Sequence, residues 1–198
     1  MSEPRSETDR VPLTDEEIRA ATIGELQPLS GPVLLADYDP EWPRLFEREA
    51  ARIRTALGQR ALQIEHVGST SVPGLAAKPI IDIIVVVADS ANEQDYVPSH
   101  AAAGYVLRIR EPEWFEHRVF KGPDTNVNIH VFSSGCEEIQ RMLAFRDRLR
   151  RNDSDRELYE RSKRELAQRE WKYVQNYADA KTSVVEAIVA RALGDEES

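Results

Sequence analysis

The sequence predicts an α+β fold: a mixed β-sheet flanked by helices in the first two thirds of the chain, and a helical last third. Three observations support this prediction. Short β-branched runs alternate with Gly- and Pro-containing turns, and the most apolar run is 80–87. Polar and apolar residues alternate over 126–132, as in a strand with one covered face. After Ser133-Ser134-Gly135, the pattern is helical to the end of the chain.

Length, composition and charge indicate a globular protein with a single sizeable core. The 198 residues are 41% hydrophobic and 31% charged. The formal net charge is -9, of which residues 1–30 carry -4 and residues 195–197 carry -3, so the body of the chain is near -2. This near balance argues against a broad nucleic-acid-binding face, although it leaves room for a local basic pocket that holds one phosphate group.

Cysteine content and hydropathy favour a cytoplasmic protein. Cys136 is the single cysteine, so no intramolecular disulfide forms, which fits a reducing compartment. The N-terminal residues lack the basic-then-apolar pattern of a signal peptide. No apolar run approaches the roughly 20 residues that span a bilayer. We therefore expect cytoplasmic localisation and no membrane partner.

Three segments are expected along the chain. Residues 1–32 form a flexible acidic extension with one short helix, and its first residues are expected to be disordered. Residues 33–194 form a single domain, and residues 195–198 form an acidic tail. The helix of the extension is predicted after Thr14, because Thr14 and Glu17 have the spacing of a capping box.

The elements of the domain follow in order. Asp39-Pro40 predicts the start of a long helix and Gly58 its end. The Gly122-Pro123-Asp124 turn joins the last two strands as a hairpin. The expected elements are a short helix to about 21, a strand over 33–36, a helix over 40–57, strands over 61–67 and 80–87, a helix over 90–103, strands over 105–110, 115–121 and 126–132, and helices over 137–151, 154–170 and 173–193.

The first candidate site lies where a small-residue turn meets the most apolar strand. Gly68 and Ser69 open a turn that presents backbone N–H groups to an anion, and Thr70 adds a hydroxyl. Asp82 is the one charge in the strand that follows, and a buried unpaired carboxylate is costly. A divalent metal that bridges Asp82 and a phosphate would satisfy it, with Lys78 beside a phosphate oxygen. The alternative is an ordinary turn and an acid bonded to backbone N–H groups.

These residues belong to a longer motif. Residues 66–83, HVGSTSVPGLAAKPIIDI, resemble the signature of the GrpB family, and the resemblance covers about 33–193. Further agreement comes from 37–43, 128–131 and 145–150, and from Tyr159, Lys163, Tyr177 and Lys181. The resemblance implies the nucleotidyltransferase fold of the polymerase-beta-like superfamily. In that fold, a Gly-Ser turn binds phosphates and strand acids bind magnesium.

For function, the resemblance implies binding of a nucleotide or another phosphorylated small molecule, with nucleotidyl transfer and Mg²⁺ as the corresponding chemistry. One departure leaves open whether the protein is an enzyme. Active members of the superfamily have a second acid two positions along the strand, where this chain has Ile84, and two-metal catalysis needs several carboxylates. Related domains are fused to dephospho-coenzyme A kinase. The alternative is therefore a non-catalytic accessory module that assists folding of a protein partner or binds a coenzyme A-related ligand.

Two histidines are candidates for roles beside Asp82. Glu65 and His66 point to opposite faces of their strand, so only one faces the site, and we expect it to be His66. His130 lies in the strand whose polar residues share one face. Together with Asp82, these histidines would form a Zn or Mn site of a metal-dependent hydrolase, or an acid–base set for a small substrate. Two hydrogen-bonded structural histidines are the alternative.

The helical third supplies the cations. The resemblance places Arg146 and Lys181 where the family has cations, and Tyr177 lies one helical turn before Lys181. Most other charged residues of these helices are expected to form a solvated face. The candidate catalytic and metal-binding residues are therefore Asp82, His66 and His130, and the candidate phosphate- or nucleotide-binding residues are Gly68, Ser69, Thr70, Lys78, Arg146, Tyr177 and Lys181.

Overall fold

The computed structural model describes residues 11–29 and 31–196. Its strands are β1 (Gln63–Val67), β2 (Ile81–Val87), β3 (Val106–Glu111), β4 (His117–Lys121) and β5 (Val127–Ser133). They form a five-stranded sheet in the order β1-β2-β5-β4-β3. The central pair β2 and β5 is parallel and the other neighbours are antiparallel. The predicted mixed sheet is confirmed.

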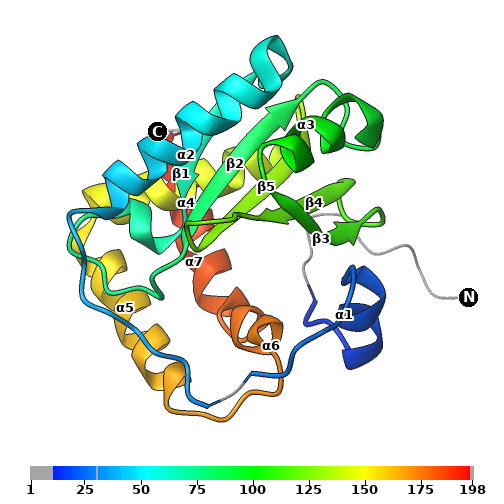
Figure 1. The fold of residues 1–198 in the computed structure, drawn as a ribbon. Coiled ribbons are helices and arrows are strands. Elements are labelled where there is room, and N and C mark those ends of the chain that lie inside the picture. Colours follow the sequence, from blue (N-terminus) through cyan, green and yellow to red (C-terminus); the bar gives the residue numbers. More distant parts are fainter. Residues whose placement is uncertain (1–10, 30, 197–198) are drawn as a thin grey trace, which may run out of the picture.

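Helices lie on both sides of this sheet. They are α1 (Asp15–Ala21), α2 (Trp42–Leu57), α3 (Val97–Ala102), α4 (Glu137–Arg151), α5 (Asp153–Ala167), α6 (Val174–Asp179) and α7 (Thr182–Glu196). In Figure 1, α2 runs along β1 and β2 on one side, and α1, α5 and α6 lie on the other. Within the described ranges, no helix is long and apolar enough to cross a membrane.

One face of the sheet, the core face, carries the main apolar core. Ile83 of β2 is paired with Ile129 of β5, and both are fully buried. Because paired residues point to the same side, alternate positions of both strands add further aliphatic side chains to this face. Ile53 and Leu57 of α2 cover them. The predicted apolar face of the strand over 126–132 is therefore the core face.

The opposite face, the cavity face, is only partly covered. Ile139 of α4 packs on Val67, Ile84 and Phe132, which point to this side. Further along the helices, Leu149 of α4 belongs to a second apolar cluster shared by α5 and α7. The part of the sheet beyond these contacts carries polar side chains and a cavity.

Three expected elements differ in the structure. Residues 33–36 make only an isolated bridge to Ala77 instead of a strand. The helix expected over 90–103 contracts to α3, which has a proline in its first turn. The helix expected over 173–193 divides into α6 and α7, which are separated by a turn at Ala180 and Lys181. The other helices and strands agree closely with their predicted ranges.

The N-terminal helix forms as the sequence predicts. Thr14 Oγ1 accepts from the backbone N–H of Glu17, and the Glu17 carboxylate accepts from the N–H of Thr14. This reciprocal pair is the predicted capping box, and α1 ends at Ala21. The expected disorder at the N-terminus concerns residues 1–10, and part of the expected acidic tail is 197–198. Both ranges lie outside the described residues.

The segment after this helix packs against the domain. Ile18 is buried, and Thr22 forms a bridge with Ile109 at the edge of the sheet. The backbone N–H of Leu13 donates to Asp179 Oδ2 of α6 at 3.0 Å. These contacts tie the described part of the extension to both β3 and α6.

Candidate functional site

A cavity of about 620 Å³ lies over the cavity face of the sheet. Its floor is formed by the polar residues of β2, β4 and β5. Its walls come from the 3₁₀ turn η2 (Ser69–Ser71), from α5 and α6, and from residues of the N-terminal segment such as Leu13 and Ile18. Elements from both ends of the described chain therefore meet around one space.

The floor of the cavity is a row of three polar side chains across the sheet. Asp82 is paired with Asn128, and Asn128 with Lys121, so the three point to one face. Asn128 Nδ2 donates to Asp82 Oδ1 at 2.7 Å, and Lys121 Nζ donates to Asn128 Oδ1. The amide is bonded at both ends and therefore fixes the orientation of the carboxylate.

Asp82 is held as a carboxylate against the backbone of the turn. Burial alone would raise its pKa, but the hydrogen bond and charge of His130, with Asn128 and Lys78, hold the pKa below its ordinary value. A Cβ built on Gly68 would lie 2.5 Å from Asp82 Oδ2, and Gly68 has a φ of +71°. Glycine is therefore required here both for the backbone conformation and for the close approach of the carboxylate.

The turn itself is closed by its own hydroxyl groups. Ser71 Oγ donates to the carbonyl of Gly68 at 2.6 Å, and Thr70 Oγ1 donates to the carbonyl of Ile80 at 3.1 Å. Gly68, Ser69 and Thr70 all line the cavity. Ser69 Oγ accepts from Lys163 Nζ of α5 at 3.2 Å. The three turn residues predicted from the sequence are therefore next to Asp82.

Two Tyr-x-x-x-Lys pairs bring cations to this turn. Lys163 Nζ lies 4.8 Å from the ring centroid of Tyr159, and Lys181 Nζ lies 5.0 Å from that of Tyr177. Lys78 Nζ approaches the same Tyr177 ring at 5.2 Å. Such contacts attract an ammonium group to a ring face. Three ammonium groups, which we call the lysine cluster (Lys78, Lys163 and Lys181), thus gather at one end of the cavity.

The lysine cluster carries positive charge that is poorly balanced. Burial, together with the charge of Lys181, lowers the pKa of Lys163 to about 7 and that of Lys78 to about 8, and burial also lowers the pKa of Lys181. Within the described residues, none of the three forms an ion pair. The hydroxyl of Tyr177 is buried there without a hydrogen-bond partner. An anionic ligand would stabilise this arrangement.

A chain of side chains continues from Asp82 in the other direction. His130 Nε2 lies 3.6 Å from Asp82 Oδ1, and His130 Nδ1 lies 3.0 Å from His117 Nε2. His117 Nδ1 lies 2.6 Å from Glu111 Oε2. His117 Nδ1–H donates to the Glu111 carboxylate, and one proton is shared between His117 Nε2 and His130 Nδ1. When that proton lies on His130 Nδ1, His130 Nε2 can take up a second proton, and this gives the cation whose hydrogen bond and charge lower the pKa of Asp82.

The expectation that His66 faces this site is wrong. His66 is paired with Ile83, which lies on the core face, whereas Glu65 is paired with Ile84 and shares the face of Asp82. The alternation predicted for Glu65 and His66 is correct, but the pairing register places them the other way round. His66, His130 and Asp82 therefore do not converge on one face of the sheet.

Arg146 also lies apart from the lysine cluster. Its guanidinium donates to Glu65 Oε2 and to Asp147 Oδ1, each at 2.8 Å, and to the backbone carbonyl of His66 at 3.1 Å. Two carboxylates thus balance its charge, and the side chain ties α4 to β1. The other predicted phosphate-binding residues, including Lys78, Tyr177 and Lys181, line the cavity.

Asp82 and His130 are the candidate metal-binding residues that the structure brings together. In the part of the chain that the structure describes, no group of three His, Cys, Asp or Glu residues is placed to hold a metal ion. Asp82 and His130 offer two donor atoms, whereas zinc sites use three or four protein ligands. Magnesium is commonly bound by one or two carboxylates together with phosphates of a ligand and water.

Four residues of the site were not chosen from the sequence: Tyr159, Lys163, Glu111 and His117. The two on α5 had a usable signal, because they repeat the Tyr-x-x-x-Lys spacing of Tyr177 and Lys181. Glu111 and His117 had none, since their contact forms across the β3–β4 hairpin and depends on its register.

Comparison with known proteins identifies close relatives. Residues 32–191 match the family described as GrpB protein. A UPF0157 protein of Halalkalibacterium halodurans is 62% identical over 192 residues, covering 97% of this chain and 98% of the relative. The crystal structure of conserved protein GrpB from Enterococcus faecalis is similar with a TM-score of 0.73 and 33% identity, covering 83% of this chain and 100% of that one.

A further relative carries a name with a defined activity. A dephospho-CoA kinase of Mycolicibacterium paratuberculosis is 43% identical over 89 residues, which is 43% of this chain and 22% of the kinase. The similarity therefore involves a minor part of that protein.

Proposed function

The chain belongs to the GrpB protein family, and from this premise we propose that its large cavity binds the phosphate groups of a nucleotide or another phosphorylated small molecule. The lysine cluster carries the proposal. Three partly desolvated ammonium groups without ion-pair partners among the described residues line the cavity, and the charge of Asp82 acts on two of them, Lys78 and Lys181. Phosphate oxygens are the partners that such ammonium groups bind.

The turn and the tyrosines have complementary roles in this proposal. The backbone at Gly68 and the hydroxyls of Ser69 and Thr70 hold phosphate oxygens. Tyr177 offers its buried hydroxyl to the ligand while its ring positions two lysines. Asp82 would hold a magnesium ion, which would neutralise phosphate charge. A Gly-Ser turn beside a strand acid also supports our finer proposal of a nucleotidyltransferase-like fold.

Nucleotidyl transfer to a small acceptor is the reaction class that this arrangement favours. The acceptor oxygen would attack the α-phosphorus of a nucleoside triphosphate, pyrophosphate would leave, and the hydroxyl proton would pass to His130 Nε2. His117 and Glu111 would stabilise the protonated ring through their hydrogen bonds. Because Ile84 stands where a second acid would lie, the reaction would depend on the Asp82 carboxylate and the His130 imidazole.

A panel of phosphorylated compounds tests the binding proposal. Titration calorimetry with Mg²⁺ and ATP, GTP, CTP, UTP, coenzyme A and dephospho-coenzyme A should reveal at least one ligand. Lys181→Gln should weaken its binding about tenfold, as expected for loss of a charge-assisted contact. Arg54→Gln, which removes an exposed charge from α2 on the core side, should bind as the wild type does. Absence of binding to every compound, or equal affinity in Lys181→Gln, would remove the proposal.

Coenzyme A-related compounds belong in that panel for a specific reason. The relative named dephospho-CoA kinase shares 89 residues with this chain, which favours a second candidate: a module that binds such a ligand, or supports a protein partner, without catalysis. Stoichiometric binding of dephospho-coenzyme A with no turnover of any triphosphate would favour this candidate over nucleotidyl transfer.

A further inference from the structure

A second cavity of about 460 Å³ lies behind the same turn. The turn η2 separates the two spaces, because Ser69 and Thr70 line the large cavity while Ser71 lines the second one. We propose that this second cavity binds a small molecule with a flat apolar body and one anionic group, a carboxylate or a phosphate monoester. The proposal is independent of what the large cavity binds.

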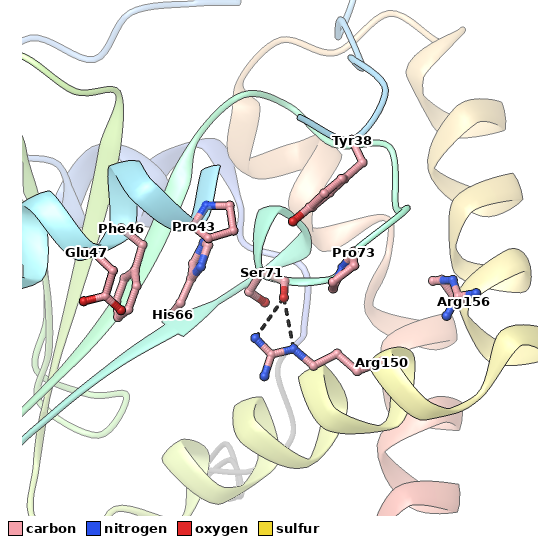
Figure 2. A pocket seen from close by; sticks show the side chains of 9 residues that line it. All are labelled: Tyr38, Pro43, Phe46, Glu47, His66, Ser71, Pro73, Arg150 and Arg156. Atoms are coloured by element: carbon pink, nitrogen blue, oxygen red, sulfur yellow. Dashed lines mark hydrogen bonds between the residues drawn. The ribbon is translucent and has the colours of Figure 1, made fainter. Parts of the chain in front are cut away.

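One end of the second cavity is cationic (Figure 2). Arg150 Nε and Nη2 donate to the carbonyl of Ser71 at 3.0 and 2.9 Å, and Nη1 lies 3.4 Å from Asp147 Oδ1. These bonds fix the guanidinium and leave part of its fork of N–H donors for a ligand. Burial and the neighbouring Arg146 lower the pKa of Arg150, so an added anion would balance this cation. Arg156 lies at the same end.

The wall beside this cationic end is flat and uncharged. The rings of Phe46 and His66 are stacked, with centroids 4.8 Å apart and planes 8° from parallel. Burial, assisted by Arg150, lowers the pKa of His66 to about 4, so the ring is neutral at physiological pH. Figure 2 shows the hydroxyl of Tyr38 pointing toward Ser71. A planar apolar ligand therefore has surfaces to lie against.

The charges at the two ends give the ligand a direction. Glu47 lies beside Phe46, at the end of the cavity away from Arg150 and Arg156 (Figure 2). A carboxylate there repels an anionic group, so the anion belongs at the arginine end and the apolar body against the aromatic wall. The Arg150 guanidinium is preorganised for the anion, because it is already bonded to the carbonyl of Ser71. A preorganised group loses little conformational entropy when a ligand binds.

The wall residue His66 is also fixed in one tautomer. Thr70 Oγ1 uses its proton to donate to the carbonyl of Ile80, so it accepts from His66 Nε2–H at 3.1 Å. His66 Nδ1 is then the unprotonated nitrogen of the ring. A rigid aromatic wall next to a fixed guanidinium is a combination typical of sites for small aromatic anions.

A nuclear magnetic resonance titration of the full chain tests this site. The probes are phenyl phosphate, benzoate, inorganic phosphate and benzyl alcohol, and the readout is the backbone amide signals of Tyr38, Phe46 and Gly74. We expect saturable shifts with phenyl phosphate or benzoate, and at least fivefold weaker binding of inorganic phosphate and benzyl alcohol. The two aromatic anions identify whether the phosphate or the carboxylate is preferred.

Two arginine variants separate this site from general charge effects. Arg156→Gln should weaken binding of the preferred aromatic anion about fivefold, and Arg164→Gln, which removes an exposed arginine from the same helix, should leave it unchanged. Because Arg156 bonds only Asp153 and a backbone carbonyl in the described structure, its variant should fold normally. The proposal is overturned if neither anion gives saturable shifts at these amides, if benzyl alcohol binds equally well, or if both variants behave alike.

Discussion

The two faces of the sheet differ in how the buried charges beside them are balanced. On the core side, Glu49 of α2 is fully buried, and its carboxylate accepts from the Tyr105 hydroxyl at 2.6 Å and from Thr125 Oγ1 at 2.5 Å. Arg52 lies 3.7 Å from the same carboxylate. On the cavity side, Lys163 is almost as deeply buried, yet among the described residues its ammonium group donates only to neutral oxygens, those of Ser69 and Ala76.

This difference separates buried charges that stabilise the fold from buried charges that favour binding of a ligand. A buried carboxylate with several donors stabilises its surroundings, and removing it leaves those donors unsatisfied. A buried ammonium among other ammonium groups reduces stability unless an anion arrives. The core side should therefore lose stability when its charge is removed, whereas the cavity side should lose ligand binding and little or no stability.

The largest effect is expected for Glu49→Ala. The substitution leaves the Tyr105 hydroxyl and Thr125 Oγ1 without their shared acceptor and removes the carboxylate that lies 3.7 Å from Arg52, so the free energy of unfolding should fall by about 3–5 kcal/mol. Chemical denaturation measures this. Glu47→Ala, at an exposed position of the same helix, should change stability by less than about 0.5 kcal/mol. Similar losses in the two variants would contradict the role given to Glu49.

A second core-side test uses pH. Burial lowers the pKa of His100 from 6.5 to about 4. Between these values the unfolded chain binds a proton that the folded chain does not, so stability should fall as pH falls through this window, by about 3 kcal/mol at its lower end. His100→Phe keeps a ring against Phe120 and should reduce the slope between pH 6.5 and 4 by about half, because His66, whose pKa is also lowered to about 4, contributes the rest. An unchanged slope in the variant would show that other groups cause the acid sensitivity.

An intermediate effect is expected at the turn that meets Asp82. Gly68→Ala adds a Cβ close to the carboxylate at a positive φ, so stability should fall by about 2–3 kcal/mol. Gly74→Ala is the matched control, because Gly74 has a φ of +79° but no atom within 4 Å of an added Cβ. Its cost should be about 1 kcal/mol, from the backbone conformation alone. Equal costs would mean that the contact with Asp82 is relieved without strain.

The smallest stability effect, with the opposite sign, is expected for Lys163→Met. Methionine keeps an unbranched apolar chain beside Tyr159 and removes an unbalanced ammonium group, so stability should stay the same or rise by about 1 kcal/mol. Binding of the phosphorylated ligand found by calorimetry should weaken about tenfold. A loss of stability comparable to that of Glu49→Ala would contradict the prediction that the charge of Lys163 does not stabilise the fold.

The sequence predicts the scaffold of the site well, because the relevant signals are local. Gly68 and the residues after it form the expected turn, and the alternation around Asn128 and His130 places both on the face of Asp82. The capping box of α1 is likewise a contact over three residues. Such features depend on backbone chemistry and side-chain period, which are readable without the tertiary structure.

Contacts that depend on register or on helix docking were not readable in the same way. The choice between Glu65 and His66 depends on a one-residue register with β2, and the sequence-based choice was wrong. Selecting Lys163 rather than Arg146 requires knowing how α4 and α5 dock on the sheet. The contact between His117 and His130 forms only when β4 pairs with β5.

The role of the lysine cluster is tested by the number of protons that the protein exchanges when the phosphorylated ligand binds. With the pKa of Lys163 at about 7 and that of Lys78 at about 8 before binding, a bound anion should raise both values, so the protein should take up protons at pH 8. Calorimetry in two buffers with different ionisation enthalpies should give an uptake that falls in Lys163→Met and persists in Arg54→Gln. Binding without proton uptake, or with the same uptake in Lys163→Met, would contradict the claim that the lysine cluster holds the anion.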